Sequence, residues 1–159
     1  MTITLIKVDE TLPINPSESG TLPLLTRDLI WDGLLLKVYD AKPFVPLMTK
    51  CDVTKEMENG IVRDIIFDGM PLKERIILYP KKKVEFIRVG FGDEMGTIWN
   101  EILEDENGGL HLRFAFELEI ANLSLKEEKD YREKRATGYV NAVQATIDHL
   151  HDLAAKGNL

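Results

Sequence analysis

The sequence has a single cysteine, Cys51, among its 159 residues. A lone cysteine excludes an intrachain disulfide and a metal site built from several thiolates. The chain also lacks an apolar run of the roughly 20 residues that a membrane-spanning helix needs. Residues 1–6 are followed by charged residues, not by a small-residue cleavage site, so we expect no signal peptide. These absences predict a cytoplasmic protein in which Cys51 is a small core residue.

Positive charge is also in short supply, with 20 Lys and Arg against 27 Asp and Glu and a net charge of −7. Nucleic acids and anionic membranes are bound largely through Lys and Arg, so neither is an expected partner. The histidines His111, His149 and His151 are expected at the surface, without the convergence that a metal site requires. We therefore expect no metal and no cofactor.

Length and composition favour one globular domain spanning residues 1–159, because 44% of the residues are hydrophobic and 30% charged. Residues 2–8 are rich in β-branched types and predict a first strand. Residues 12–25 hold several prolines and read as a loop. Thr26 can cap a helix that continues to Val38. The prolines beyond that helix leave room for at most a short second helix around Phe44.

A run of short strands is predicted from Met48 to Ile120. Six apolar segments are separated by turn signals such as Asp68-Gly69, with no helical segment between them. This pattern is typical of hairpins in an antiparallel meander. In residues 110–118 the apolar and polar residues alternate, so one face of the sheet is expected to be covered and the other wet.

A long helix is predicted to cover that face. Ser124 and Glu127 have the spacing of a capping box, and apolar and aromatic residues then recur at helical spacing as far as Gly157, a plausible stop. A helix of about 30 residues is about 45 Å long and must lie across the sheet. The expected fold class is α+β, with a curved antiparallel sheet of about seven strands wrapped around a long C-terminal helix and two short helices after the first strand.

The turn at Asp68-Gly69 predicts a strand register. A two-residue hairpin loop there places Asp64 opposite Lys73 and Arg63 opposite Glu74, which are two favourable cross-strand charge pairs from one assumption. If Leu78 then faces Val84 in the next hairpin, Arg88 also falls opposite Glu74. The covered face is expected to be apolar apart from the four residues Arg63, Glu74, Arg88 and Asn100.

These polar residues have two readings. They form either an ion-pair cluster near the sheet edge that water can reach, or the few polar anchors of an otherwise apolar ligand pocket. Gly138, in the middle of the long helix, either allows close packing or leaves room for a ligand. The candidate ligand-binding residues are Arg63, Glu74, Ile76, Phe86, Arg88, Ile98, Asn100, Phe114, Phe116, Tyr131, Arg135 and Tyr139.

The order of elements and five stretches of sequence resemble the AtaL-like family of the START and birch-pollen-allergen-like superfamily, which has the helix-grip (SRPBCC) fold. The stretches are residues 25–37, 44–46, 73–80, 96–100 and 112–118. The resemblance implies a hydrophobic cavity and a ligand role. Some fungal relatives lie beside genes for secondary-metabolite pathways. The wider superfamily includes lipid carriers, hormone receptors and polyketide cyclases, and the fold alone does not choose among them.

Three functions remain open from the sequence. The first is a binding or carrier module for a small apolar organic molecule, such as an aromatic or polyketide-like metabolite. The second is a cyclase, dehydratase or isomerase in which Glu74 is the acid or base and Arg63 or Arg88 steadies negative charge. The third is a regulatory protein with a vestigial cavity. In each case we expect a monomer or weak dimer.

Overall fold

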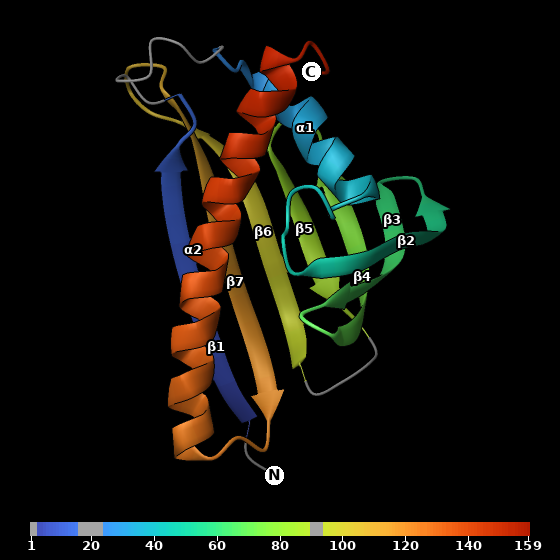
Figure 1. Ribbon diagram of the computed structural model, residues 1–159, viewed down its shortest axis with the longest axis vertical. Helices are drawn as coiled ribbons and strands as arrows, with labels where there is room; N and C mark the ends of the chain where they lie inside the picture. The colour runs from blue at the N-terminus through green and yellow to red at the C-terminus, as the bar shows by residue number, and fades with distance from the viewer. Residues whose placement is uncertain (1–2, 16–23, 90–93) are drawn as a thin grey trace.

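A computed structural model of the chain shows an α+β fold in which an antiparallel sheet of seven strands, in the order β1-β7-β6-β5-β4-β3-β2, holds a long helix against one face (Figure 1). It describes residues 3–15, 24–89 and 94–159, except for the side chains of residues 94, 135, 136, 139 and 140. The elements are β1 (Ile3–Pro13), α1 (Arg27–Tyr39), β2 (Met48–Met57), β3 (Gly60–Phe67), β4 (Met70–Tyr79), β5 (Lys83–Arg88), β6 (Glu94–Glu104), β7 (Leu110–Ala121) and α2 (Leu125–Ala155).

The meander predicted from the turn signals is confirmed as strands β2 to β7, and β1 joins the sheet beside β7. The first strand extends beyond the predicted residues 2–8, because Pro13 still pairs with His111. The second short helix is reduced to one helical turn, in which the N–H groups of Phe44 and Val45 donate to the carbonyl of Ala41. The curved sheet therefore has one helix before the meander and one after it.

The predicted register is confirmed in both hairpins. Asp68 and Gly69 have φ angles of 50° and 77°, as a two-residue hairpin loop requires. Arg63 pairs with Glu74 across β3 and β4, and Glu74 pairs with Arg88 across β4 and β5. The side chains of all three charged residues therefore lie on the same face of the sheet, toward the helices.

The boundaries of α2 follow from its sequence. The hydroxyl of Ser124 accepts a hydrogen bond from the Glu127 N–H, and the Glu127 carboxylate accepts one from the Ser124 N–H. The helix ends where Gly157 adopts φ 75°, with Asn158 N–H donating to the carbonyl of Leu153. None of the described helices has the length and apolar character that crossing a bilayer demands.

The C-terminal half of α2 packs tightly. Val143, Ile147 and Leu150 are buried against the sheet and α1. A Cβ at Gly33 would collide with the side chain of Leu150, so glycine allows the close approach of α1 and α2. The two helices meet near the C-terminus of the chain (Figure 1). This packing fixes α1 over the sheet and positions its C-terminal end above β3 to β6.

The surface position expected for His151 is wrong. Its side chain is buried, and Nε2 shares a hydrogen bond with the carbonyl of Ile14, because the segment after β1 covers the last turns of α2. His149 is half-buried and lies edge-on to the ring of Phe44. Cys51 is buried as expected.

Candidate functional site

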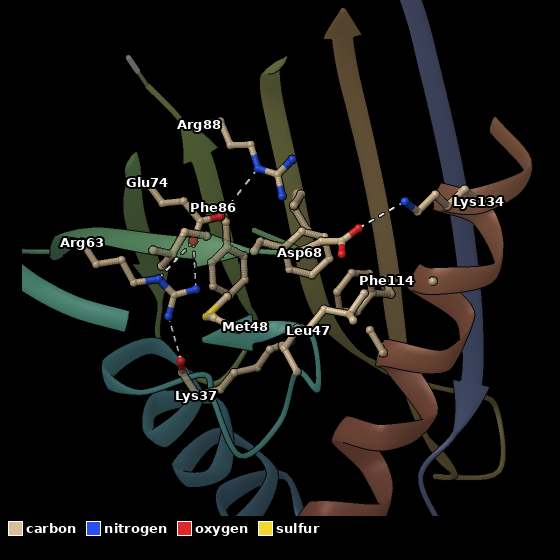
Figure 2. Close-up of a pocket in the computed structure, with 16 residues that line it drawn as sticks. Lys37, Leu47, Met48, Arg63, Asp68, Glu74, Phe86, Arg88, Phe114 and Lys134 are labelled. Atoms are coloured by element: carbon tan, nitrogen blue, oxygen red, sulfur yellow. Dashed lines mark hydrogen bonds and ion pairs between the residues drawn. The ribbon is translucent and has the colours of Figure 1, made fainter. Parts of the chain in front are cut away.

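A cavity lies between the sheet and the helices (Figure 2). It offers about 70 Å³ to the centres of water-sized molecules, within about 660 Å³ of space that includes its open side. A single water needs only about 10–15 Å³ on the first measure, so several waters or a small organic group fit. The walls are Lys37, Val45, Leu47, Met48, Arg63, Ile65, Phe67, Asp68, Glu74, Phe86, Arg88, Ile98, Phe114, Lys134, Gly138 and Ala142.

The cavity has an exposed mouth and a buried end. Leu47, Asp68 and Lys134 are exposed, whereas Arg63 and Glu74 are each only 2% exposed. At the mouth, Lys134 of α2 forms an ion pair of 3.2 Å with Asp68 of the β3–β4 turn. Figure 2 shows this pair on the opposite side of the Phe86 ring from Arg63 and Glu74. A ligand entering past the mouth therefore crosses apolar walls before it meets the buried charges.

Arg63 joins the sheet to the end of α1. Its Nε and Nη2 donate to Glu74 Oε1 at 3.0 and 2.9 Å, and its Nη1 donates to the carbonyls of Lys37 and Val38 at 2.9 and 2.8 Å. The last carbonyls of a helix carry partial negative charge and lack partners within the helix, so a guanidinium there is favourable. The predicted Arg63–Glu74 pair is thus a deeply buried cap for α1, and water does not reach it from the sheet edge.

Arg88 stands on the other side of Glu74. Its Nε lies 4.0 Å from Glu74 Oε2, a longer contact than the 2.9 Å between Arg63 and the same carboxylate. Arg88 is 4% exposed and lines the cavity. Among the described residues, Arg63 and Arg88 place two guanidinium groups beside the carboxylate of Glu74, so this end of the cavity is rich in basic groups.

Lys37 brings a third basic group to the same end. The side chain comes from the last turn of α1 and is buried, and its Nζ donates to Asn100 Oδ1 at 2.8 Å. The same Nζ lies 4.7 Å from the ring centroid of Phe114 and 5.7 Å from that of Phe86, both of which line the cavity. The amine therefore sits where the aromatic walls meet the charged cluster.

The surroundings of Lys37 disfavour its protonated form. Burial, with a smaller contribution from the charge of Arg63, lowers the pKa of Lys37 to about 7, although Glu74 acts in the opposite direction. Among the described residues no carboxylate lies within ion-pair distance of its Nζ, which donates to the amide oxygen of Asn100. The amine is thus present in both protonation states near neutral pH.

Six of the twelve residues expected to bind ligand line this cavity. Four others do not line it. Ile76 and Phe116 point from the same face of the sheet into the filled part of the core, and Tyr131 packs half-buried at the edge of that core. Asn100 contacts Lys37 but does not border the cavity itself. The side chains of Arg135 and Tyr139 lie outside the described residues. The six lining residues are Arg63, Glu74, Phe86, Arg88, Ile98 and Phe114.

Sequence reasoning missed Lys37, and a signal for it existed. It lies three residues after Leu34 and seven after Ile30, on the buried stripe of α1. A lysine on such a stripe is expected to be buried. For the α2 wall, reasoning placed the inward stripe one position away from the residues Lys134, Gly138 and Ala142 that line the cavity. The loop residues 45–48 carried no signal.

The surroundings of Gly138 favour the interpretation that this glycine leaves room for a ligand. A Cβ built on Gly138 meets no described heavy atom within 4 Å, and the residue borders the cavity. The glycine therefore widens the cavity and makes no close backbone contact there. No cluster of at least three His, Cys, Asp or Glu side chains suited to a metal ion occurs in the part of the chain that the structure describes.

Comparison with known proteins places this cavity in a family context. Residues 8–157 match the family model described as acetylaranotin biosynthesis cluster protein L, AtaL. No curated protein shows significant sequence similarity to the chain. The family match covers nearly all the described elements, including both walls of the cavity.

Solved structures with the same fold include three aromatase/cyclase proteins. The Zhui aromatase/cyclase from Streptomyces sp. R1128 is 13% identical, with a TM-score of 0.70, and the match covers 99% of this chain and 100% of that one. The di-domain proteins StfQ, from the steffimycin pathway, and BexL, from the BE-7585A pathway, are 10% and 12% identical, with TM-scores of 0.70 and 0.65. The matches cover 96% and 93% of this chain, which spans about half of each di-domain protein (52% and 49%).

Proposed function

Because the chain belongs to the AtaL family, described as acetylaranotin biosynthesis cluster protein L, we propose that it binds a small aromatic or polyketide-like metabolite in the cavity between the sheet and α2. The ligand has an apolar ring body and an acidic oxygen group, such as a carboxylate, phenolate or enolate. The observation that carries the proposal is the combination of apolar walls with three basic side chains around one carboxylate at the buried end.

The walls account for the ring body. Phe86, Ile98, Phe114, Met48 and Ile65 all line the cavity and are themselves buried. Ligand pockets are usually built in this way, from apolar side chains with a few placed polar groups. The aromatase/cyclase proteins StfQ and BexL come from the steffimycin and BE-7585A biosynthetic pathways, which supports a ring-containing metabolite as the ligand class.

The buried end accounts for the acidic group. Arg63 is committed to Glu74 and to the end of α1, and Arg88 and Lys37 bring two further basic groups to the same end of the cavity. Hydrogen bonds to charged groups contribute about 1.5–3 kcal/mol, roughly tenfold to a hundredfold in affinity. An acidic ligand is therefore expected to bind more tightly than a neutral one of the same shape.

Glu74 has a positioning role in this proposal. Its Oε1 accepts two hydrogen bonds from Arg63, and its Oε2 faces Arg88. Both carboxylate oxygens therefore face guanidinium groups, and we assign Glu74 the positioning of Arg63 in place of an acid–base role. Glu74→Gln is expected to weaken the anchoring of Arg63.

The test compares 2-naphthoate with 2-naphthalenemethanol, which has the same ring system without the charge. Isothermal titration calorimetry should show at least tenfold tighter binding of the acid by the unaltered protein. In Arg88→Met the preference for the acid should fall several-fold, because one of the basic groups at the buried end has been removed while Lys37 remains. A preference for the alcohol, or no saturable binding of either probe, would contradict the proposal.

Arg113→Met is the matched control. It makes the same substitution on the outer face of the sheet, where Arg113 pairs with Asp9 and Glu101. Both variants change the net charge equally, so only a local effect separates them. The control should keep the acid preference of the unaltered protein.

A further inference from the structure

We propose that Lys37 is a covalent catalyst, whose amine condenses with a ketone carbonyl of the bound molecule to form an imine. The inference rests on the proposed function, since the carbonyl compound must occupy the same cavity. It assigns to that cavity a reaction and a substrate class: a ring-bearing ketone, above all a β-dicarbonyl compound.

The first support is the place of the amine. Lys37 lines the cavity, and its Nζ is held by Asn100 Oδ1 at 2.8 Å and lies 4.7 Å from the centroid of Phe114. A hydrogen bond from one N–H fixes the amine without consuming its lone pair. A carbonyl group stacked along the Phe86 and Phe114 walls would meet the nitrogen directly.

The second support is the charge around the amine. The groups facing it are Arg63 of β3, Glu74 of β4 and Asn100 of β6, with Arg88 of β5 at the same end of the cavity. A lysine becomes a nucleophile when it is desolvated or lies beside another cation, because both disfavour the ammonium form. Lys37 meets both conditions, and its pKa of about 7 leaves a large share of neutral amine at physiological pH.

The third support is a donor beside the amine. Asn100 is fully buried, and its Nδ2 has no hydrogen-bond partner among the described residues. Its Oδ1 on the same amide group contacts Lys37 Nζ. An unused buried donor costs about 1–3 kcal/mol, so the amide that holds Lys37 keeps hydrogen-bonding capacity that the amine alone does not fill.

The step balances without any further reagent. The neutral Nζ adds to the ketone carbon, and a proton moves from nitrogen to oxygen to give a carbinolamine. Water then leaves and an imine forms, so the only by-product is one water molecule. Protonation of the imine nitrogen makes the neighbouring C–H acidic, and the water released in the previous step accepts its proton to leave an enamine. The enamine carbon can then add to a carbonyl farther along the same molecule than the β position, so that a ring of five or six atoms closes, and the oxygen of that carbonyl takes the proton back. Hydrolysis by one water releases the cyclised product and restores the amine.

A β-dicarbonyl compound suits the site best. Its imine is conjugated with the second carbonyl, which yields a stable vinylogous amide. The oxygen of that second carbonyl carries partial negative charge, which the cationic end of the cavity stabilises through Arg88 and Arg63. The same chemistry makes the adduct easy to detect.

The test uses 1-phenyl-1,3-butanedione as the probe. Incubation with the unaltered protein should produce a near-ultraviolet band of the vinylogous amide and an intact-protein mass raised by one diketone less one water. Peptide mapping should place the adduct on Lys37. Its rate of formation should rise with pH around a midpoint near 7, as the pKa of Lys37 predicts, whereas an ordinary surface lysine reacts only at much higher pH.

Two variants and one binding measurement make the test decisive. Lys37→Met and Lys37→Arg should form no adduct, and the arginine variant keeps a positive charge that the methionine variant lacks. Lys7→Met, on the outer face of the sheet in a pair with Glu117, should react like the unaltered protein. If the unaltered protein binds 2-naphthoate but forms no diketone adduct, or if the adduct persists in Lys37→Arg, only the catalytic role of Lys37 is overturned. If the unaltered protein binds neither 2-naphthoate nor the diketone, the proposed function is overturned too.

Discussion

At the scale of single residues, Lys37 is a buried amine whose pKa lies well below the usual value for lysine. A buried amine that loses its proton near pH 7 has been shifted from the ordinary lysine value of 10.5, to which the unfolded chain returns. The folded state therefore binds fewer protons than the unfolded state between these two values. Stability rises with pH throughout that window, because unfolding takes up a proton and this uptake becomes less favourable as the pH rises.

This linkage predicts a measurable pH dependence of stability. Between about pH 7 and about pH 9, the free energy of unfolding should rise by about 2 kcal/mol more for the unaltered protein than for Lys37→Met. Urea denaturation at the two pH values gives both numbers, and taking the difference removes the contributions of every other titrating group. Equal pH slopes in the two proteins would show that the folded chain holds Lys37 protonated.

Residues also show where sequence reasoning succeeds. The Arg63–Glu74–Arg88 cluster follows from hairpin geometry, since one two-residue turn at Asp68-Gly69 determines which side chains face each other. Lys37 joins that cluster through the docking of α1 on the sheet, a long-range contact that no local pattern encodes. The position of Lys37 on the buried stripe of α1 predicts that its side chain is buried, but it does not predict which residues contact it.

At the scale of elements, the sequence of α2 favours a helix except at one residue of low helix propensity, Gly138, which faces the cavity. Gly138 lies in the open space between the helix and the sheet, where a Cβ would meet no described atom within 4 Å. Glycine in a helix interior costs about 1 kcal/mol relative to alanine. Room for a ligand is the physical reason that fits a glycine with nothing packed against it.

The glycine gives a prediction that separates stability from binding. Gly138→Ala should raise the free energy of unfolding by about 1 kcal/mol. Gly138→Leu should be at least as stable as the unaltered protein but bind 2-naphthoate on the order of tenfold more weakly, because its side chain fills ligand space. Thr137→Leu, at the neighbouring exposed position, should leave affinity unchanged. Undiminished binding by Gly138→Leu would place the ligand elsewhere.

The elements themselves were largely readable from the sequence. The capping box at Ser124 and Glu127 and the left-handed Gly157 mark both ends of α2, and turn residues mark each hairpin. The residues of α2 that border the cavity were less readable. Lys134 and Gly138 lie one position before Arg135 and Tyr139, whose side chains lie outside the described residues. Periodicity identifies an amphipathic helix but does not say which residues at the edge of its apolar stripe border a cavity.

At the scale of the whole molecule, a cavity is a region where side chains do not fill the space between the sheet and the helices. The hydrophobic pattern of the sequence does not reveal such a region, because a completely filled core has the same pattern of apolar residues. The resemblance of the sequence to the AtaL-like family supplies the expectation of a cavity, and the structure locates it beneath α2 and beside α1. What the sequence does record is the charge of the molecule, and that charge bears on how a ligand arrives.

The net charge of −7 opposes the approach of an acidic ligand, whereas the buried end of the cavity attracts it. Salt screens the first effect, which acts over distances near the Debye length, and leaves the second nearly untouched. The association rate of 2-naphthoate should therefore increase by roughly twofold to threefold between ~0.01 M and ~0.15 M NaCl, with little change in the dissociation rate. Stopped-flow fluorescence measures both rates. An association rate that falls with added salt would mean that the mouth, where Lys134 stands, steers the anion inward against the charge of the molecule as a whole.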